Sequence, residues 1–192
     1  MSDRELTPER LLAALRELHA SREADVRAEW QRSLPLADYI VDRWERARTL
    51  GFGAGSSVYD QALVLGDVEV GEKTWIGPGT VLDGSGGLRI GATCSISAGV
   101  QIYTHDSVRW ALSGGAAEYE HAPVTIGDHC YIGPCTIVTM GVTIGRHCLV
   151  GAHSLVNRDL PDYSIAYGVP CRAVGRVEVD GAKVKLVYPD AP

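Results

Sequence analysis

The sequence predicts an all-β parallel β-helix, and three observations support this prediction. From Val58 onward an aliphatic residue returns at every sixth position. Glycine often follows that aliphatic directly, and a small residue (Ala, Thr, Ser or Cys) commonly stands four places after it. The aliphatic positions form three runs: Val58, Val64, Val70, Ile76 and Leu82; then Ile90, Ile96 and Ile102; then Ile126, Ile132, Val138, Ile144, Val150 and Val156.

A period of six fits neither a helix nor an ordinary strand. It does fit one flat face of a parallel β-helix, in which each face contributes one inward aliphatic and ends at a sharp corner. Three such faces make a coil of about 18 residues, and successive coils stack at the ordinary strand spacing of about 4.8 Å. The 14 matched positions therefore predict about five coils within residues 53–160.

Residues 1–52 are expected to form a helical cap. Thr7 and Pro8 are suited to start a helix, which the spacing of leucines extends to about residue 31. A second helix is expected over residues 36–50, ending at Gly51. Because the open end of a repeat protein must be covered, these helices are expected to pack on the first coil.

The repeat is interrupted twice. The spacing from Leu82 to Ile90 widens to eight residues, and a loop over residues 103–125 separates Ile102 from Ile126. A loop this long in a strict repeat is usually functional. Beyond the repeat, residues 161–192 are expected to form a tail and a β-hairpin around Asp180-Gly181 that caps the other end.

The segments PVTIGDHCYIGP, GVTIG and VGAHSLVNRDLPDYSIAYGVPCRAVGR resemble the hexapeptide-repeat acyltransferases, in particular the sugar and xenobiotic O-acetyltransferases. The resemblance covers residues 58 to about 176 and implies that the parallel β-helix is left-handed. It also implies a homotrimer that transfers an acyl group, typically acetyl, from acyl-CoA to a small-molecule acceptor at each subunit interface. No permanently bound cofactor and no metal are implied.

His105 stands at the root of the long loop, in the triplet Thr104-His105-Asp106. In the family that this chain resembles, a histidine at the matching place is the general base. The chemistry needs such a group, since an attacking hydroxyl or amine must lose a proton and imidazole titrates near neutral pH. Asp106, Arg109 and Trp110 in the same loop are candidates for binding the polar acceptor.

The resemblance also places the coenzyme against the later coils. Tyr131 would form an aromatic wall, Gly133 and Ala152 would lie along the pantetheine arm, and the nucleotide end would meet four further residues. These are Asn157, Arg158, Arg172 and Arg176. Guanidinium groups suit phosphates. The chain departs from the family at Pro134, which has no N–H to donate to an oxyanion.

Composition limits the other function classes. The net charge of −6 argues against a nucleic-acid or membrane-surface role, and the start of the sequence has no apolar signal segment, so a cytoplasmic protein is expected. Two alternatives stay open: a catalytically silent β-helical scaffold, and a zinc enzyme like the γ-type carbonic anhydrases. The second would use His129, His147 and His153, which occupy repeat corners where turn formation is their default role.

Overall fold

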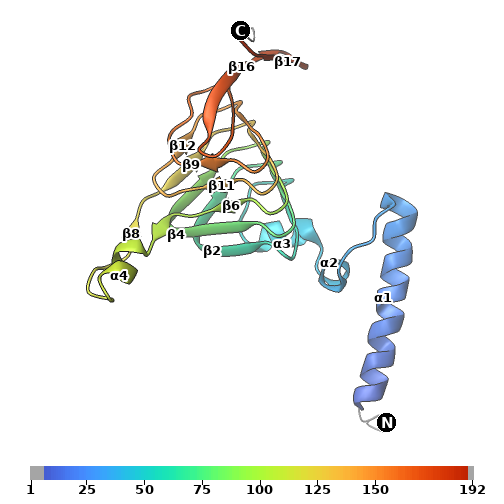
Figure 1. Cartoon of the computed structure of the whole chain (residues 1–192). Helices are drawn as coiled ribbons and strands as arrows, with labels where there is room; N and C mark the ends of the chain where they lie inside the picture. The colour runs from blue at the N-terminus through green and yellow to red at the C-terminus, as the bar shows by residue number, and fades with distance from the viewer. Residues whose placement is uncertain (1–6, 190–192) are drawn as a thin grey trace. The chain divides into compact units, whose positions relative to one another are not determined.

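The computed structural model describes residues 7–189 of the chain, which divides into two compact units, Met1–Asp42 and Arg43–Pro192. The outermost parts of the expected cap and tail, residues 1–6 and 190–192, lie outside the described residues. Figure 1 shows the order of the elements along the chain.

The first unit consists of α1 (Pro8–Trp30), a connection and α2 (Leu36–Ile40). The Thr7 side chain accepts a hydrogen bond from the Arg10 N–H and Pro8 opens the helix, as their sequence positions predict. Tyr39 of α2 is buried, and its ring meets that of His19 in a T-shaped contact with 5.1 Å between the ring centroids.

The prediction of a single helix over residues 36–50 is wrong, because the chain forms two helices there. Val41 adopts an extended conformation (φ −101°, ψ 112°) and ends α2, and α3 (Arg43–Thr49) then begins the second unit. An extended residue cannot continue the helical hydrogen-bond ladder. α3 packs against the first strand of the β-helix and buries Ala47 in its core.

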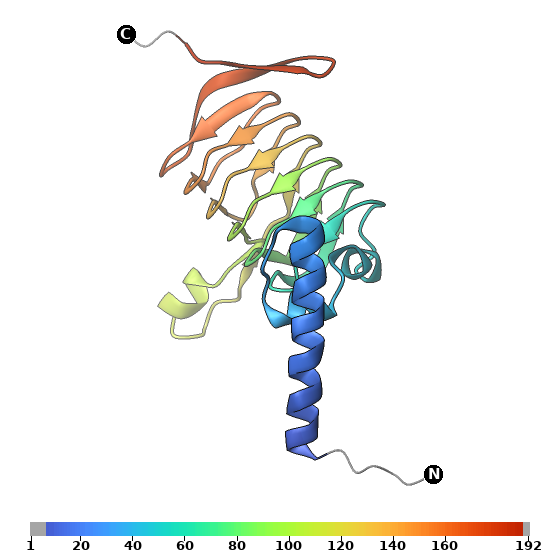
Figure 2. The same cartoon turned by 90° about the vertical axis from the view of Figure 1, so that its right-hand side faces the viewer.

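The second unit is a left-handed parallel β-helix with three flat faces. Figure 2 shows the strands of the first face, face A, stacked one above another. Its strands are β1 (Ser57–Val58), β3 (Trp75–Ile76), β5 (Ser95–Ile96), β10 (Tyr131–Ile132), β13 (Leu149–Val150) and β15 (Ser164–Tyr167). Equivalent residues of neighbouring coils pair in register, such as Tyr131 with Leu149.

Face B and face C follow face A around each coil. Face B contains the first halves of β2 (Leu63–Val70) and β4 (Val81–Ile90), followed by β6 (Gln101–Ile102), β11 (Ile137–Val138) and β14 (Leu155–Val156). Face C contains the second halves of β2 and β4, followed by β9 (Val124–Ile126) and β12 (Thr143–Ile144).

Six strands stack on face A, so the β-helix has about six turns and extends beyond the limit at residue 160 that the repeat pattern predicts. The last turn escaped the pattern for two reasons. Ala166 pairs with Val150 after 16 residues instead of 18, and its inward side chain is a methyl group in place of a larger aliphatic.

The inward positions form one continuous core. Ile76, Leu82, Ile96, Ile102 and Ile132 are fully buried, as the period of six predicts. Val64 is the exception among the repeat aliphatics, since it is only partly buried at the edge of the core in the first coil.

Replacing Ile132 with alanine is expected to lower the free energy of unfolding by roughly 2 to 5 kcal/mol, because the side chain is wholly buried and its truncation leaves a cavity. Chemical denaturation followed by circular dichroism measures this loss. Val179→Ala, at a side chain that is 40% exposed, is the matched control and should change stability by less than about 1 kcal/mol. Equal losses in the two variants would contradict the assignment of the core.

The repeat corners explain most of the remaining histidines and cysteines. His129, His147 and His153 have φ values of 60°, 54° and 53°, so their expected role as turn residues is confirmed. All five cysteines are free thiols, and Cys94, Cys130 and Cys148 are buried. The Cys130 thiol donates to the Gly145 carbonyl oxygen of the next coil, with 3.0 Å between the sulfur and oxygen atoms.

The C-terminal hairpin consists of β16 (Arg172–Asp180) and β17 (Lys183–Val187), joined at Gly181. β16 pairs antiparallel with β15, so the hairpin covers the last coil as predicted. Within residues 7–189, no helix combines the length and the apolar character that crossing a membrane requires.

Candidate functional site

The candidate site lies at the corner between faces B and C, where the long loop leaves the β-helix. This loop, residues 103–125, is called the arm below. It contains β7 (His105–Asp106), α4 (Val108–Leu112) and β8 (Glu120–His121), and it projects from the side of the β-helix in Figures 1 and 2. β7 and β8 pair antiparallel and bring His105 opposite His121.

The coil beneath the arm contains a two-residue insertion that packs against the root of the arm. The eight-residue spacing from Leu82 to Ile90 makes room for a bulge beginning at Asp83, whose side chain is completely buried. Gly86 approaches the arm so closely that a Cβ atom there would lie 2.4 Å from the Thr104 carbonyl oxygen. The bulge and the arm root therefore pack as one structure.

Asp83 collects hydrogen bonds from both sides of this junction. One carboxylate oxygen accepts from the backbone N–H and the hydroxyl of Ser85. The other accepts from the Thr104 N–H at 2.9 Å and from His105 Nδ1 at 2.7 Å. Burial alone would raise the pKa of Asp83, but the hydrogen bonds from Ser85, Thr104 and His105 outweigh it and hold the pKa well below its usual range.

This carboxylate fixes the His105 tautomer. An ionised carboxylate can only accept hydrogen bonds, so Nδ1 must carry the proton that it donates to Asp83. The lone pair of the neutral ring is then on Nε2. The side chain is 32% exposed, so a molecule from solvent can reach the ring. His105 lies at the arm root, as predicted from the sequence, but the orienting role of Asp83 was not predicted.

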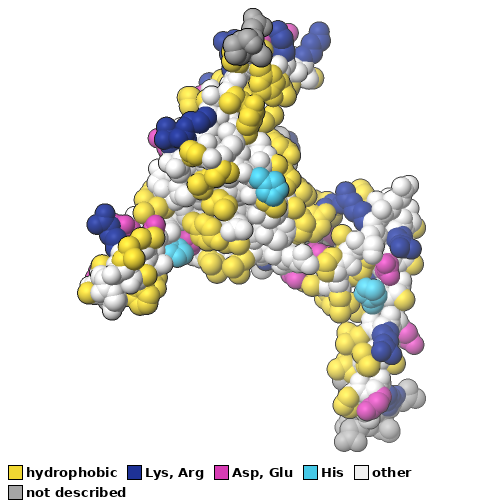
Figure 3. Space-filling view, viewed as in Figure 1, with side chains coloured by type: hydrophobic (Ala, Val, Ile, Leu, Met, Phe, Trp, Pro, Cys, Tyr) yellow, Lys and Arg dark blue, Asp and Glu magenta, His cyan; other side chains and the backbone are white. Residues whose placement is uncertain are grey.

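The arm surrounds His105 with aromatic rings. The Tyr119 ring lies almost parallel to the imidazole, at 8° with 6.2 Å between centroids, and Trp110 meets Tyr119 edge to face at 5.5 Å. The His121 ring is 6.1 Å from that of His105. Figure 3 shows hydrophobic side chains over this projecting arm.

The three predicted acceptor residues have different surroundings. Trp110 is 43% exposed beside the aromatic cluster. The Arg109 Nε lies 3.0 Å from a Glu120 carboxylate oxygen, and Asp106 accepts a hydrogen bond from the Val108 N–H within α4. All three residues therefore lie on the same arm as His105.

Four of the seven predicted coenzyme residues lie at the two edges of face B. Gly133 and Ala152 lie at the corner between faces A and B, where a Cβ on Gly133 would be 2.5 Å from the Ala152 nitrogen. Asn157 and Arg158 follow β14 at the corner between faces B and C, the same edge as His105, and both are exposed. One face of the β-helix separates the two groups.

The other three predicted coenzyme residues lie on face A and the hairpin. Tyr131 is 44% exposed on face A, in an apolar notch with Leu149 and the hairpin residues Val179, Val184 and Leu186. Arg172 begins β16 and donates to the Cys171 carbonyl oxygen. Arg176 lies further along β16 and forms an ion pair with Glu178 at 2.7 Å.

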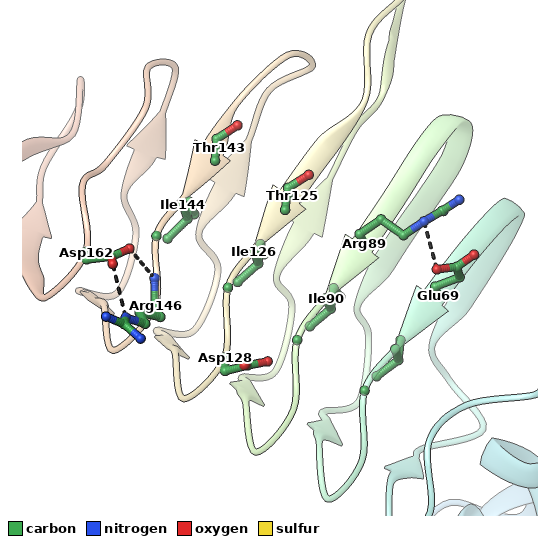
Figure 4. A pocket seen from close by; sticks show the side chains of 15 residues that line it. Glu69, Arg89, Ile90, Thr125, Ile126, Asp128, Thr143, Ile144, Arg146 and Asp162 are labelled. Atoms are coloured by element: carbon green, nitrogen blue, oxygen red, sulfur yellow. Dashed lines mark hydrogen bonds and ion pairs between the residues drawn. The ribbon is translucent and has the colours of Figure 1, made fainter.

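Face C contains a groove of about 600 Å³ that includes none of the predicted site residues (Figure 4). Thr125 and Thr143 line its floor. Its arginines are paired: Arg89 with Glu69 at 2.9 Å and Arg146 with Asp162 at 3.1 Å. The hexad pattern gives no signal for this groove, because the pattern records the inward aliphatics and the corner glycines, whereas the polar side chains that line the groove are outward residues.

The corner between faces C and A carries stacked rings instead of a metal site. His129 and His147 have ring centroids 4.6 Å apart, and the Tyr163 ring stacks on His147 at 4.9 Å. Burial and the neighbouring His129 lower the pKa of His147. Among residues 7–189, no group of three or more His, Cys, Asp and Glu side chains is arranged to hold a metal ion.

Comparison with known proteins supports the resemblance to the hexapeptide-repeat acyltransferases. Residues 123–158 match the bacterial transferase hexapeptide model of six repeats. The galactoside O-acetyltransferase of Escherichia coli (strain K12) is 27% identical over 128 residues, which cover 56% of this chain. The match spans 63% of the length of that relative.

Two solved structures are similar in both sequence and fold. A hexapeptide-repeat-containing acetyltransferase from Vibrio cholerae is 27% identical with a TM-score of 0.59, over 85% of this chain and 92% of that one. A maltose O-acetyltransferase from Clostridium difficile 630 is 26% identical with a TM-score of 0.55, over 87% of this chain and 86% of that one. This chain therefore carries the hexapeptide repeat of bacterial transferases and resembles the hexapeptide-repeat acyltransferases in sequence and in fold.

Proposed function

We propose that this protein transfers an acyl group, typically acetyl, from acyl-CoA to a hydroxyl or amino group of a sugar or other small polar acceptor. One observation carries the proposal: His105 is held by the buried Asp83 at 2.7 Å and remains accessible at the root of the arm. The similar proteins named as galactoside and maltose O-acetyltransferases support the same reaction class.

In the proposed mechanism, His105 Nε2 removes the proton of the acceptor while the acceptor oxygen or nitrogen attacks the thioester carbonyl carbon. Asp83 stabilises the imidazolium that forms and keeps Nε2 directed at the acceptor. The tetrahedral intermediate collapses, the carbon–sulfur bond breaks, and the CoA thiolate takes up a proton. Transfer is direct, so no acyl-enzyme forms and no metal takes part.

The proposed coenzyme site uses the residues along both edges of face B. The edges are separated by about 15 Å, the length of a five-residue strand. A groove between two subunits would bring one edge from each and would place acyl-CoA between Gly133 and Ala152 on one side and His105 on the other. We therefore include a homotrimer in the proposal, with one site at each of three interfaces.

The outer surface of face B suits such a contact. The residue before each inward aliphatic points outward, and on this face these residues are mostly apolar. Leu63 is 50% exposed and Ile137 is 37% exposed, with Val81 and Leu155 partly exposed beside them. The corresponding residues of face C are Glu69, Arg89, Thr125 and Thr143, which are polar. Apolar surface is better buried against another subunit than left in water.

Pro134 cannot supply an oxyanion hydrogen bond, so either another amide supplies it or the proposed reaction depends more on His105 and on positioning. The Pro134 carbonyl oxygen accepts from the His153 N–H at 2.9 Å, a hydrogen bond that joins this corner to the next coil.

Arg172 and Arg176 are proposed to lie near the 3′-phosphate of the coenzyme. Replacing both with alanine is expected to weaken acetyl-CoA binding by about 10-fold or more and dephospho-CoA binding much less, since only the first ligand carries that phosphate. Calorimetric titration with both ligands measures the difference. Lys183→Ala removes an exposed cation of the same hairpin and serves as the control. Equal losses for the two ligands would remove the assignment.

The proposed function is tested by release of free thiol from acetyl-CoA in the presence of a panel of sugars and amino sugars. Thiol release that depends on an acceptor, with acylated product in equal amount, is the expected result. Thiol release that does not depend on any acceptor would indicate thioester hydrolysis and would overturn the proposal.

A further inference from the structure

We infer that α1 forms a parallel three-helix bundle with the α1 helices of two further subunits, through a face of leucines in its first half. This inference rests on the homotrimer of the proposed function and adds a second contact that holds the three subunits together. Two features of α1 support it. The helix has no buried residue, and its charged side chains avoid one broad face.

α1 lacks the packing that a long helix needs, because none of its 23 residues is buried. α2 packs on the second half of the helix, where the Tyr39 ring meets His19 and the Tyr39 carbonyl oxygen accepts from Arg22 Nε. Most of the stability of a helix comes from covering its apolar face. The leucines of the first half remain exposed: Leu11 (44%), Leu12 (49%), Leu15 (37%) and Leu18 (46%).

The spacing of these leucines fits a coiled-coil heptad, whose positions are lettered a to g. Leu11 and Leu18 occupy d and Leu15 occupies a. Arg16 and Glu17, the charged residues between positions 11 and 21, fall at b and c on the other side of the helix. A two-stranded coiled coil usually carries charges at e and g, whereas the helices of a larger bundle bury these positions as well. The residues at e and g are uncharged or small: Leu12, Ala14, His19 and Ser21.

The leucine face is short, which explains why the bundle needs the rest of the protein. It ends where Arg22 follows at a and lies 3.8 Å from the Asp25 carboxylate at d. A bundle of about two heptads is marginal by itself. In a cyclic trimer the three helices are related by rotation about one axis, so they meet in parallel. Attachment to the β-helices raises their effective concentration, so even a weak bundle opposes dissociation of the trimer.

A fluorescent probe at position g tests the contact directly. Ala14→Cys is labelled with pyrene maleimide in a Cys135→Ser background, because Cys135 is exposed and the other four cysteines are buried. Excimer emission is expected, since the g positions border the core of the bundle and bring the labels of neighbouring helices together. Ala13→Cys is the matched control. It makes the same change one residue earlier, at the outward f position, and should give no excimer emission.

Dissociation of the trimer on dilution measures what the bundle contributes. In the double variant Leu15→Lys and Leu18→Lys, the protein concentration at which half of the trimer dissociates is expected to rise by at least about 10-fold. The control is the double variant Ala13→Lys and Ala20→Lys, which adds the same charge at the two f positions. It should leave this concentration unchanged within about 2-fold. Mass photometry measures both, and thiol release from acetyl-CoA is followed on the same samples.

The outcomes separate this inference from the proposed function. Excimer emission that requires position g and disappears in the leucine-to-lysine variant would support the bundle. A trimer without excimer emission, or one whose dissociation the two lysines do not change, would overturn the bundle and leave the proposed function intact. A hexamer that the two lysines convert to trimers would show that α1 joins two trimers, and would also overturn it. A monomer at every concentration would overturn both the bundle and the proposed trimer.

Discussion

Replacing His105 with alanine is expected to lower kcat by about 10²- to 10⁴-fold, with acyl-CoA affinity nearly unchanged. The reason is that the proposed role of the imidazole is to remove the proton of the acceptor and not to bind the coenzyme. His105 is the residue at which the arm root, a buried carboxylate and the aromatic cluster meet. Thiol release at saturating acetyl-CoA measures kcat, and calorimetry measures the affinity for the coenzyme.

His121→Ala provides the matched control, since its ring is 6.1 Å from that of His105 on the paired strand. His121 has no contact with Asp83 among the interactions of the described residues, and its loss should reduce kcat by less than about 10-fold. Full activity in His105→Ala would refute the mechanism and would move the role of the base to His121.

The second large effect is expected at Asp83. Asp83→Asn should lower kcat by roughly 10²- to 10³-fold, because the amide cannot accept from Ser85, Thr104 and His105 together and no longer stabilises the imidazolium. The amide NH₂ would also favour the wrong imidazole tautomer. Ser85→Ala removes one donor to Asp83 without touching His105, and it should cost less than about 5-fold in kcat.

The Asp83→Asn substitution is also expected to change how the stability of the fold depends on pH. The pKa of Asp83 in the folded protein lies below its usual value of 3.8, so ionised Asp83 stabilises the fold above that pH. This stability is lost as the pH falls below about 4 toward the folded-state pKa. Denaturation midpoints measured from pH 6 to pH 3 should therefore fall less steeply in Asp83→Asn than in the wild-type protein. Identical slopes would show that Asp83 is not held ionised in the fold.

The period of six made the core of this protein predictable from sequence. Ile132 and Ile102 are buried because each coil repeats one inward residue per face. The corner histidines have positive φ because the same period places a turn at their positions. Where the period changes, prediction fails. Ala166 follows Val150 after 16 residues, and its strand was therefore missed.

The candidate site was predictable only in part. The interruption of the repeat identifies the arm, and the resemblance to the hexapeptide-repeat acyltransferases points to His105 at the arm root as the proposed base. Asp83 was missed because it lies 22 residues earlier and meets His105 only after the two-residue bulge is folded against the arm root. A signal was present in the sequence, since an aspartate stands directly after an inward leucine where the spacing widens to eight residues.

The way in which the proposed coenzyme residues would come together could not be predicted from one chain. Gly133 and Asn157 belong to neighbouring coils, and their spacing of one coil plus one hexad puts the corners that carry them on opposite edges of face B. Sequence spacing gives the order of corners around a coil, and it does not say which surface a second subunit covers.

The most direct test of the central claim is the stoichiometry of thiol release and acylated product with acetyl-CoA and an acceptor panel, measured for the wild-type protein and for His105→Ala. An acyltransferase that uses His105 should release one thiol for each acylated acceptor, and the variant should lose this activity while still binding acetyl-CoA. A protein that does not bind acetyl-CoA and releases no thiol with any acceptor would be a silent scaffold. Stoichiometric bound zinc with CO₂ hydration would indicate a carbonic anhydrase. Either result would contradict the account.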